Sequence, residues 1–234
     1  MFRLSRIGLA AAVVLTAVAM FLYPGGTLFD RTSRGYSFFE NSFSDLGSTV
    51  AWNGQSNPGS SIEFAAAIVF VLAGGVCFLE VVRVYSSASK PRWLARAGGI
   101  GALVAGLGLV GTVLAPEDRL PELHSKLTLL VVGSFPIVTA LLAMATARDL
   151  RIPLRASVCW WVLTVLVIAW TSAMLWIRPS TGHEMAIPVT LQKVVGFALL
   201  ATLVLEGYEA ERIRAMPSNR GLDRAARASR SSGG

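Results

Sequence analysis

The sequence predicts an all-α membrane protein: a bundle of six transmembrane helices with both termini in the cytoplasm. Its 234 residues are 53% hydrophobic and only 15% charged, and the mean hydropathy is +0.58. A soluble domain usually carries about 25% charged residues. The shortage of charge is too large for a water-soluble globule of this length, whereas lipid accepts the apolar surface that water rejects.

Six apolar runs account for this composition. A helix needs about 20 residues to cross about 30 Å of hydrocarbon, and each run is close to that length. The runs do not alternate with period two, so they are not the strands of a membrane barrel. Because every backbone amide must be paired in lipid, helices remain. The runs cover residues 7–23, 62–84, 97–115, 127–147, 157–177 and 189–207.

The first run leaves one alternative open. Arg3 and Arg6 precede it, and Ala17-Val18-Ala19 resembles a signal-peptide cleavage site. The apolar run continues through Tyr23, which favours a retained first helix; cleavage would leave five spans. We therefore expect a transmembrane domain at 1–207 with an external loop at 24–60. A basic cytoplasmic tail at 208–234 follows, first helical and then largely disordered.

The positions of lysine and arginine orient the bundle. With both ends inside, fifteen of the 21 basic side chains fall on the cytoplasmic face and six on the other, as the positive-inside rule requires. This asymmetry accounts for the net charge of +7 without nucleic acid as a partner. The sequence thus predicts a multi-pass protein of the cell (plasma) membrane whose partners are membrane lipids. It leaves a homo-oligomer open.

Small residues and buried charges give further expectations for the spans. Gly98, Ala102 and Gly106 form a row that lets a neighbouring helix approach closely, and a proline interrupts the fourth run. Glu63 and Lys193 are costly in lipid. We expect these two side chains to form a pair near the external face, or each to extend to the interface.

The external loop contains the segment 36–47, in which four aromatic residues occur within eight positions. Such a density predicts a segment that packs on the bundle or lies in the interface. Its Ser-Asp-Leu-Gly piece predicts a tight turn or helix cap, in which Asp45 binds backbone N–H groups and Gly47 takes a positive φ.

The two histidines, His124 and His183, fall on the same predicted membrane face as Asp45. Imidazole and carboxylate are zinc ligands, and both serve as general acids or bases. A metal site could therefore use Asp45, His124 and His183 as ligands, with Ser44 or Glu184 supporting an attacking water. Ordinary loop and capping roles are the alternative for all five. Haem is disfavoured, because no histidine falls on the cytoplasmic face.

The segment Asn41-Ser-Phe-Ser-Asp-Leu-Gly47 and the piece from Pro116 to His124 resemble the prokaryotic six-helix membrane family catalogued as domain of unknown function 998. The resemblance covers residues from about 7 to 207. The polar positions that match it are Ser44, Asp45, Gly47, Pro116 and His124. It implies the six-helix architecture and no chemistry. A looser similarity is to ceramidase-like zinc hydrolases, but the paired histidines of their late helix are missing here.

Three functions follow from these observations. The favoured one is an uncharacterised polytopic membrane protein that acts as a lipid-facing scaffold, sensor or weak permease, because the predicted helix centres are uncharged. The alternative is a metal-dependent hydrolase that acts on lipid at the outer face, with the five residues above. A small-solute transporter is the third. The sequence leaves open whether the protein is an enzyme.

Overall fold

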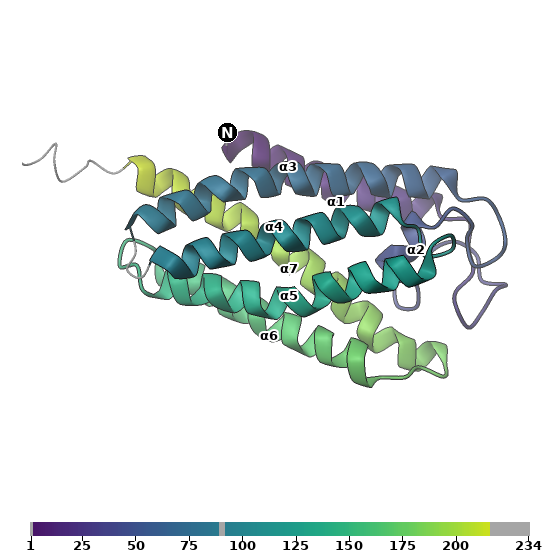
Figure 1. The fold of residues 1–234 in the computed structure, drawn as a ribbon. Coiled ribbons are helices and arrows are strands. Elements are labelled where there is room, and N and C mark those ends of the chain that lie inside the picture. The colour runs from purple at the N-terminus through teal and green to yellow at the C-terminus, as the bar shows by residue number, and fades with distance from the viewer. Residues whose placement is uncertain (1, 89–91, 216–234) are drawn as a thin grey trace, which may run out of the picture.

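A computed structural model describes residues 2–88 and 92–215, and this part of the chain is helical without named strands (Figure 1). Six of the helices are long and apolar enough to span a membrane, which confirms the six predicted spans. A short helix, α2, lies between the first two. The helices are α1 (Phe2–Leu22), α2 (Phe43–Gly47), α3 (Pro58–Ala88), α4 (Arg92–Leu114), α5 (Pro121–Ala147), α6 (Leu154–Trp176) and α7 (Gly182–Ala215).

Two of the spans are much longer than their apolar runs. α3 has 31 residues and α7 has 34, and a helix of 34 residues is about 50 Å long. Since hydrocarbon occupies only about 30 Å, both helices continue beyond it. The start of the predicted tail is therefore helical as far as Ala215, and residues 216–234 lie outside the described part of the chain.

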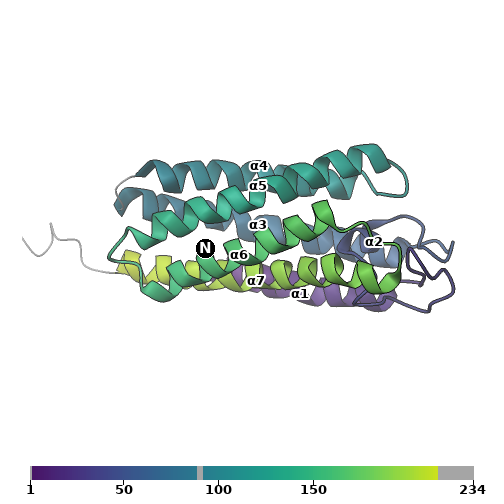
Figure 2. The ribbon, with the colours of Figure 1, turned by 90° about the horizontal axis from the view of Figure 1, so that it is seen from below.

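Five of the spans form a closed ring. Along the chain, α3 packs on α4, α4 on α5, α5 on α6 and α6 on α7, and α7 returns to contact α3. The first helix, α1, packs on the outside of this ring against α3 and α7. Figures 1 and 2 show the spans lying side by side along one long axis, and Figure 2 shows α1 next to α7.

Glycines allow α4 to pack closely against α5. A Cβ at Gly98 would lie 2.9 Å from Leu142, and one at Gly101 would lie 2.6 Å from Val138. Gly98 therefore has the predicted packing role. Gly106 differs from the prediction: a Cβ there would make only an ordinary 3.7 Å contact, with α3.

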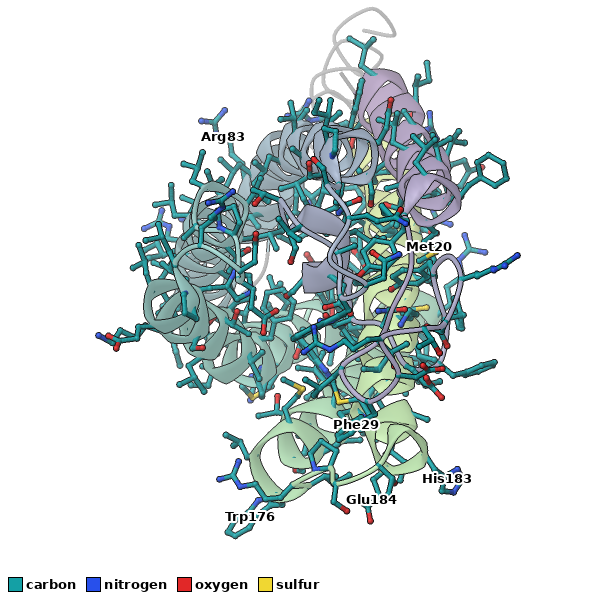
Figure 3. The ribbon with its side chains drawn as sticks, turned by 90° about the vertical axis from the view of Figure 1, so that its right-hand side faces the viewer. Met20, Phe29, Arg83, Trp176, His183 and Glu184 are labelled. Atoms are coloured by element: carbon teal, nitrogen blue, oxygen red, sulfur yellow. The ribbon has the colours of Figure 1, made fainter. Side chains whose placement is uncertain are left out.

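The connection between α1 and α3 folds over one end of the bundle as an ordered cap, defined here as residues 24–57 (Figure 3). Tyr23, Leu46 and Ala51 are buried in a small apolar cluster, against which Tyr36 and Phe43 pack. The predicted packing of this segment on the bundle is thereby confirmed. The connections between α4 and α5 and between α6 and α7 lie at the same end.

Candidate functional site

Asp45 is the centre of a polar network inside the cap. Its side chain is 6% exposed. Its carboxylate accepts hydrogen bonds from Asn41 Nδ2 at 3.0 Å, from the backbone N–H of Ser42 at 2.8 Å and from Trp52 Nε1 at 2.9 Å. Ser42 and Asp45 form a reciprocal capping box at the start of α2. The predicted capping role of Asp45 is therefore confirmed.

Gly47 does not take the positive φ that the sequence suggested. It is the last residue of α2, and the positive-φ residues of the described chain are Gly25, Gly26, Gly35 and Gly54. A Cβ at Gly47 would lie 3.4 Å from the ring of Phe64 on α3. Gly47 therefore packs α2 against α3 at ordinary contact distance.

Burial raises the pKa of the Asp45 carboxyl, and its hydrogen bonds with Asn41, Trp52 and Ser42 oppose that rise. The three donors compensate the carboxylate for the water that it has lost. Because all three come from the cap itself, Asp45 holds this segment in one conformation.

Ser44 and His124 meet where the cap touches the first turn of α5. His124 is buried and Ser44 is half-buried. Nε2 of His124 lies 3.0 Å from Ser44 Oγ, and its Nδ1 lies 2.8 Å from the carbonyl oxygen of Ala115. The two side chains are 80 residues apart in sequence. Ser44 is brought to this position because it lies in the first turn of α2, directly after the helix cap at Ser42. His124 is brought to it because it lies in the first turn of α5.

The Ala115 carbonyl defines the tautomer of this histidine. A carbonyl oxygen only accepts hydrogen bonds, so Nδ1 of His124 carries the hydrogen and donates it to the Ala115 carbonyl. In the neutral imidazole, Nε2 is then free of hydrogen and accepts from the Ser44 hydroxyl. A serine is thus hydrogen-bonded to a histidine whose ring is oriented by a third group, the arrangement that activates a hydroxyl nucleophile.

Glu117 and Asp118 lie in the connection from α4 to α5, next to this pair, and their pKa values are shifted in opposite directions. Burial raises the pKa of Glu117, the negative charge of Asp45 raises it further, and His124 opposes the rise. Hydrogen bonds from Thr49 and Val50 hold the pKa of Asp118 below its usual range, although partial burial acts against them. Asp118 accepts the backbone N–H of Thr49 at 2.9 Å, so this connection fastens the cap to the bundle.

Lys193 reaches the cap from α7. It is 1% exposed, and its Nζ donates to the Asn41 carbonyl at 2.6 Å. The ammonium also lies 5.4, 5.1 and 5.7 Å from the ring centroids of Tyr36, Phe38 and Phe43, within cation–π range. In place of the expected pair with Glu63, the carbonyl and the three rings hold this cation in a buried position. The extension of either side chain to the interface stays a prediction.

His183 and Glu184 lie away from this network. Both belong to the first turn of α7 and are exposed, and Figure 3 shows them at the edge of the bundle. Glu184 accepts the backbone N–H of Ser180 at 2.7 Å, and its own N–H donates to Thr181 Oγ1 at 3.3 Å. Glu184 is therefore a capping residue of α7.

The proposed metal ligands are not gathered into one site. Within residues 2–88 and 92–215, no group of three or more His, Cys, Asp and Glu side chains is arranged to hold a metal ion. Asp45 is surrounded by N–H donors from its own segment, whereas His183 is at the edge of the bundle. The geometry brings together Ser44 and His124 of the five candidate residues, with Asp45 next to Ser44 in the chain.

Four residues of the site were not predicted as members: Asn41, Trp52, Glu117 and Lys193. Asn41 and Glu117 lie within the two segments that the sequence singled out, so their neighbourhood was available as a signal. Trp52 and Lys193 could not be placed, because the first depends on how the cap folds back and the second approaches from 152 residues away.

The fold and site define a polytopic α-helical membrane protein with an ordered polar cap. Comparison with known protein families, with curated proteins and with solved structures finds no match for this chain. The resemblance to the six-helix family of unknown function stays a prediction.

Proposed function

We propose that this chain is a multi-pass enzyme of the cell membrane that hydrolyses or transfers an ester-linked acyl group of a lipid at the outer face. Ser44 is its nucleophile and His124 its general base. The observation that carries this proposal is the 3.0 Å contact between Ser44 Oγ and His124 Nε2, together with the carbonyl of Ala115 behind the ring.

The pair has the nucleophile and the general base of acyl transfer. Ser44 Oγ attacks the carbonyl carbon of the ester while Nε2 of His124 takes the hydroxyl proton. The same nitrogen then gives this proton to the departing alcohol, which leaves an acyl group on Ser44. Water or a second alcohol, deprotonated by His124, releases the acyl group. The Ala115 carbonyl keeps the ring in the tautomer that both steps need.

The position of the pair indicates the substrate class. His124 lies in the first turn of a membrane-spanning helix, where lipid headgroups and ester linkages meet the hydrocarbon. A soluble ester would not need a site at this depth. The proposal keeps the lipid substrate of the hydrolase hypothesis and replaces the metal-bound water by a serine nucleophile.

A fluorophosphonate probe tests the proposal. It forms a covalent bond with an activated serine, and tandem mass spectrometry identifies the modified residue. We expect labelling of Ser44 in the wild-type protein in nanodiscs and a loss of at least tenfold in Ser44→Ala and in His124→Ala. Ser61→Ala is the matched control, because that hydroxyl donates to the nearby Pro58 carbonyl at the same end of the bundle.

Two results would overturn it. One is a wild-type protein that is folded and monodisperse but is not modified at Ser44. The other is labelling of Ser44 that persists unchanged in a folded His124→Ala variant, because the serine would then react without its base.

A second candidate is a non-enzymatic scaffold or sensor, which the fastening of the cap supports. Asp118 binds Thr49, Lys193 binds the Asn41 carbonyl, and His124 binds Ser44, so three spans or their connections meet one segment. In this case Ser44→Ala and His124→Ala lower the melting temperature by similar amounts, no serine is labelled, and the contact serves only to lock the cap.

For the topology, we propose that both termini face the cytoplasm and that the cap faces outside. The fifteen-to-six division of lysine and arginine supports this orientation. A protease-cleavable tag after residue 234 should be protected in intact cells and cleaved after permeabilisation, whereas a tag inserted after Gly54 should be cleaved in both. Cleavage of the C-terminal tag in intact cells would contradict the proposal.

A further inference from the structure

We propose that the ring formed by α3 to α7 binds one acyl chain of a membrane phospholipid, at a site separate from the Ser44–His124 pair and independent of the reaction proposed above. All five of these helices line a cavity of about 370 Å³, which opens to the outside of the bundle beside α4. Among the residues around it are Gly75, Gly106, Thr139 and Trp160.

The lining selects hydrocarbon over water. Apart from Thr139 and the indole of Trp160, the side chains around the cavity are apolar. The Thr139 hydroxyl already donates to the carbonyl oxygen of Phe135 at 2.9 Å, in its own helix. A buried water needs two to four polar partners, and this wall does not offer them.

The volume fits a chain of ordinary length. An apolar cavity of about 150 Å³ accepts benzene, with its six carbon atoms. In proportion, 370 Å³ holds on the order of fifteen carbon atoms. Because the space opens toward lipid and its wall offers water few partners, a lipid chain is the occupant that fits it.

Trp160 lines the cavity on the α6 side, together with Leu163 and Val167. The residue is 2% exposed, so its indole belongs to the packed wall of the site.

The cavity is accessible from the surrounding lipid. Two of its lining residues on α4, Leu103 and Leu107, are 48% and 71% exposed. A chain can therefore enter from the side, beside α4, without passing through water.

Filling the cavity tests the site. A Cβ at Gly75 would meet nothing within 4 Å, so Gly75→Leu adds a side chain without displacing a neighbour. The probe is phosphatidylcholine that carries a diazirine near the end of one acyl chain, reconstituted with the protein in nanodiscs. We expect photo-crosslinks at Phe78 and Leu163 in the wild type and a loss of at least fivefold in Gly75→Leu.

Gly133→Leu is the matched control. A Cβ there also meets nothing within 4 Å, and the residue is exposed and outside the cavity lining. It should leave the crosslinks unchanged. If Gly75→Leu fails to fold, Gly106→Ile fills the cavity from α4, where a Cβ makes an ordinary 3.7 Å contact. Equal crosslinking at Phe78 and Leu163 in a folded filled variant would overturn the proposal.

Discussion

The hydroxyl of Thr171 on α6 donates a hydrogen bond to the backbone carbonyl of Val132 on α5 at 3.2 Å. This carbonyl is four residues before Pro136, which lies inside α5 and has no N–H to pair with it. A neighbouring helix therefore supplies the missing donor, as lipid-embedded backbone requires.

We predict that Thr171→Val lowers the free energy of unfolding by about 1 kcal/mol, because the Val132 carbonyl loses its donor in lipid. Thr171→Ser should be nearly neutral. In a Pro136→Ala background, Thr171→Val should lower the free energy of unfolding by less, because an alanine at position 136 restores the backbone N–H that pairs with the Val132 carbonyl. Denaturation by sodium dodecyl sulfate measures these values. Thr164→Val is the control, since its hydroxyl bonds only a carbonyl of its own helix. An equal cost in both backgrounds would contradict the pairing.

A second prediction concerns the donor that Trp52 gives to the Asp45 carboxylate. Trp52→Phe removes it, and a hydrogen bond to a charged group contributes about 1.5–3 kcal/mol. We expect a lower melting temperature and faster proteolysis within the cap. Trp176→Phe, at a residue that is 82% exposed, should change neither. A cap that stays equally protected in Trp52→Phe would show that Asn41 and Ser42 suffice.

A third prediction is a pH dependence at Glu117. Its folded pKa is raised, so its contribution to stability is fully present below the unfolded pKa of about 4.3 and is lost as pH rises through the folded value. Glu117→Gln should therefore be more stable than the wild type at pH 7 and similar to it near pH 4. Melting temperatures across this range measure the difference.

Asp118 should behave in the opposite way. Its folded pKa is lowered, so its contribution is present above the unfolded pKa of about 3.9 and is lost as pH falls through the folded value. Asp118→Asn should be less stable than the wild type at pH 7, and the two should converge in acid. A shift of the same sign for both variants would contradict the assignments.

The last prediction concerns the backbone of the cap. Gly26 has φ +85°, and a Cβ there would lie 2.3 Å from the backbone nitrogen of Asn53. Gly26→Ala should therefore unfold the cap. Gly54 has φ +83° with nothing within 4 Å, so Gly54→Ala should cost only about 1–2 kcal/mol of backbone strain. Hydrogen exchange of cap amides distinguishes the two, and equal protection in both variants would contradict the close approach.

The sequence was sufficient to find the spans and insufficient to find their ends. Apolarity marks where a helix enters hydrocarbon, and it does not mark where the helix stops. α3 thus continues to Ala88 and α7 begins at Gly182, because polar residues can stay helical outside lipid. His183 consequently lies on a helix, although the sequence suggested a loop.

Part of the site was predictable for a similar reason. The Ser-Asp pair carries a local capping signal, and Asp45 fulfils it. The contact of Ser44 with His124 depends on how two connections fold over the same end of the bundle, and local spacing does not encode this. The metal hypothesis took a shared membrane face as proximity, but that face is wide enough to separate His183 from Asp45.

The cap is synthesised long before two of its hydrogen-bond partners. Its residues are synthesised directly after the first span, yet the Phe43 N–H and the Asn41 carbonyl find Gln192 and Lys193, which are 149 and 152 residues later. A ribosome must therefore complete nearly the whole membrane domain before these two partners exist. Until then the cap lacks these two hydrogen bonds. Insertion of α7 both closes the ring of helices and completes the cap.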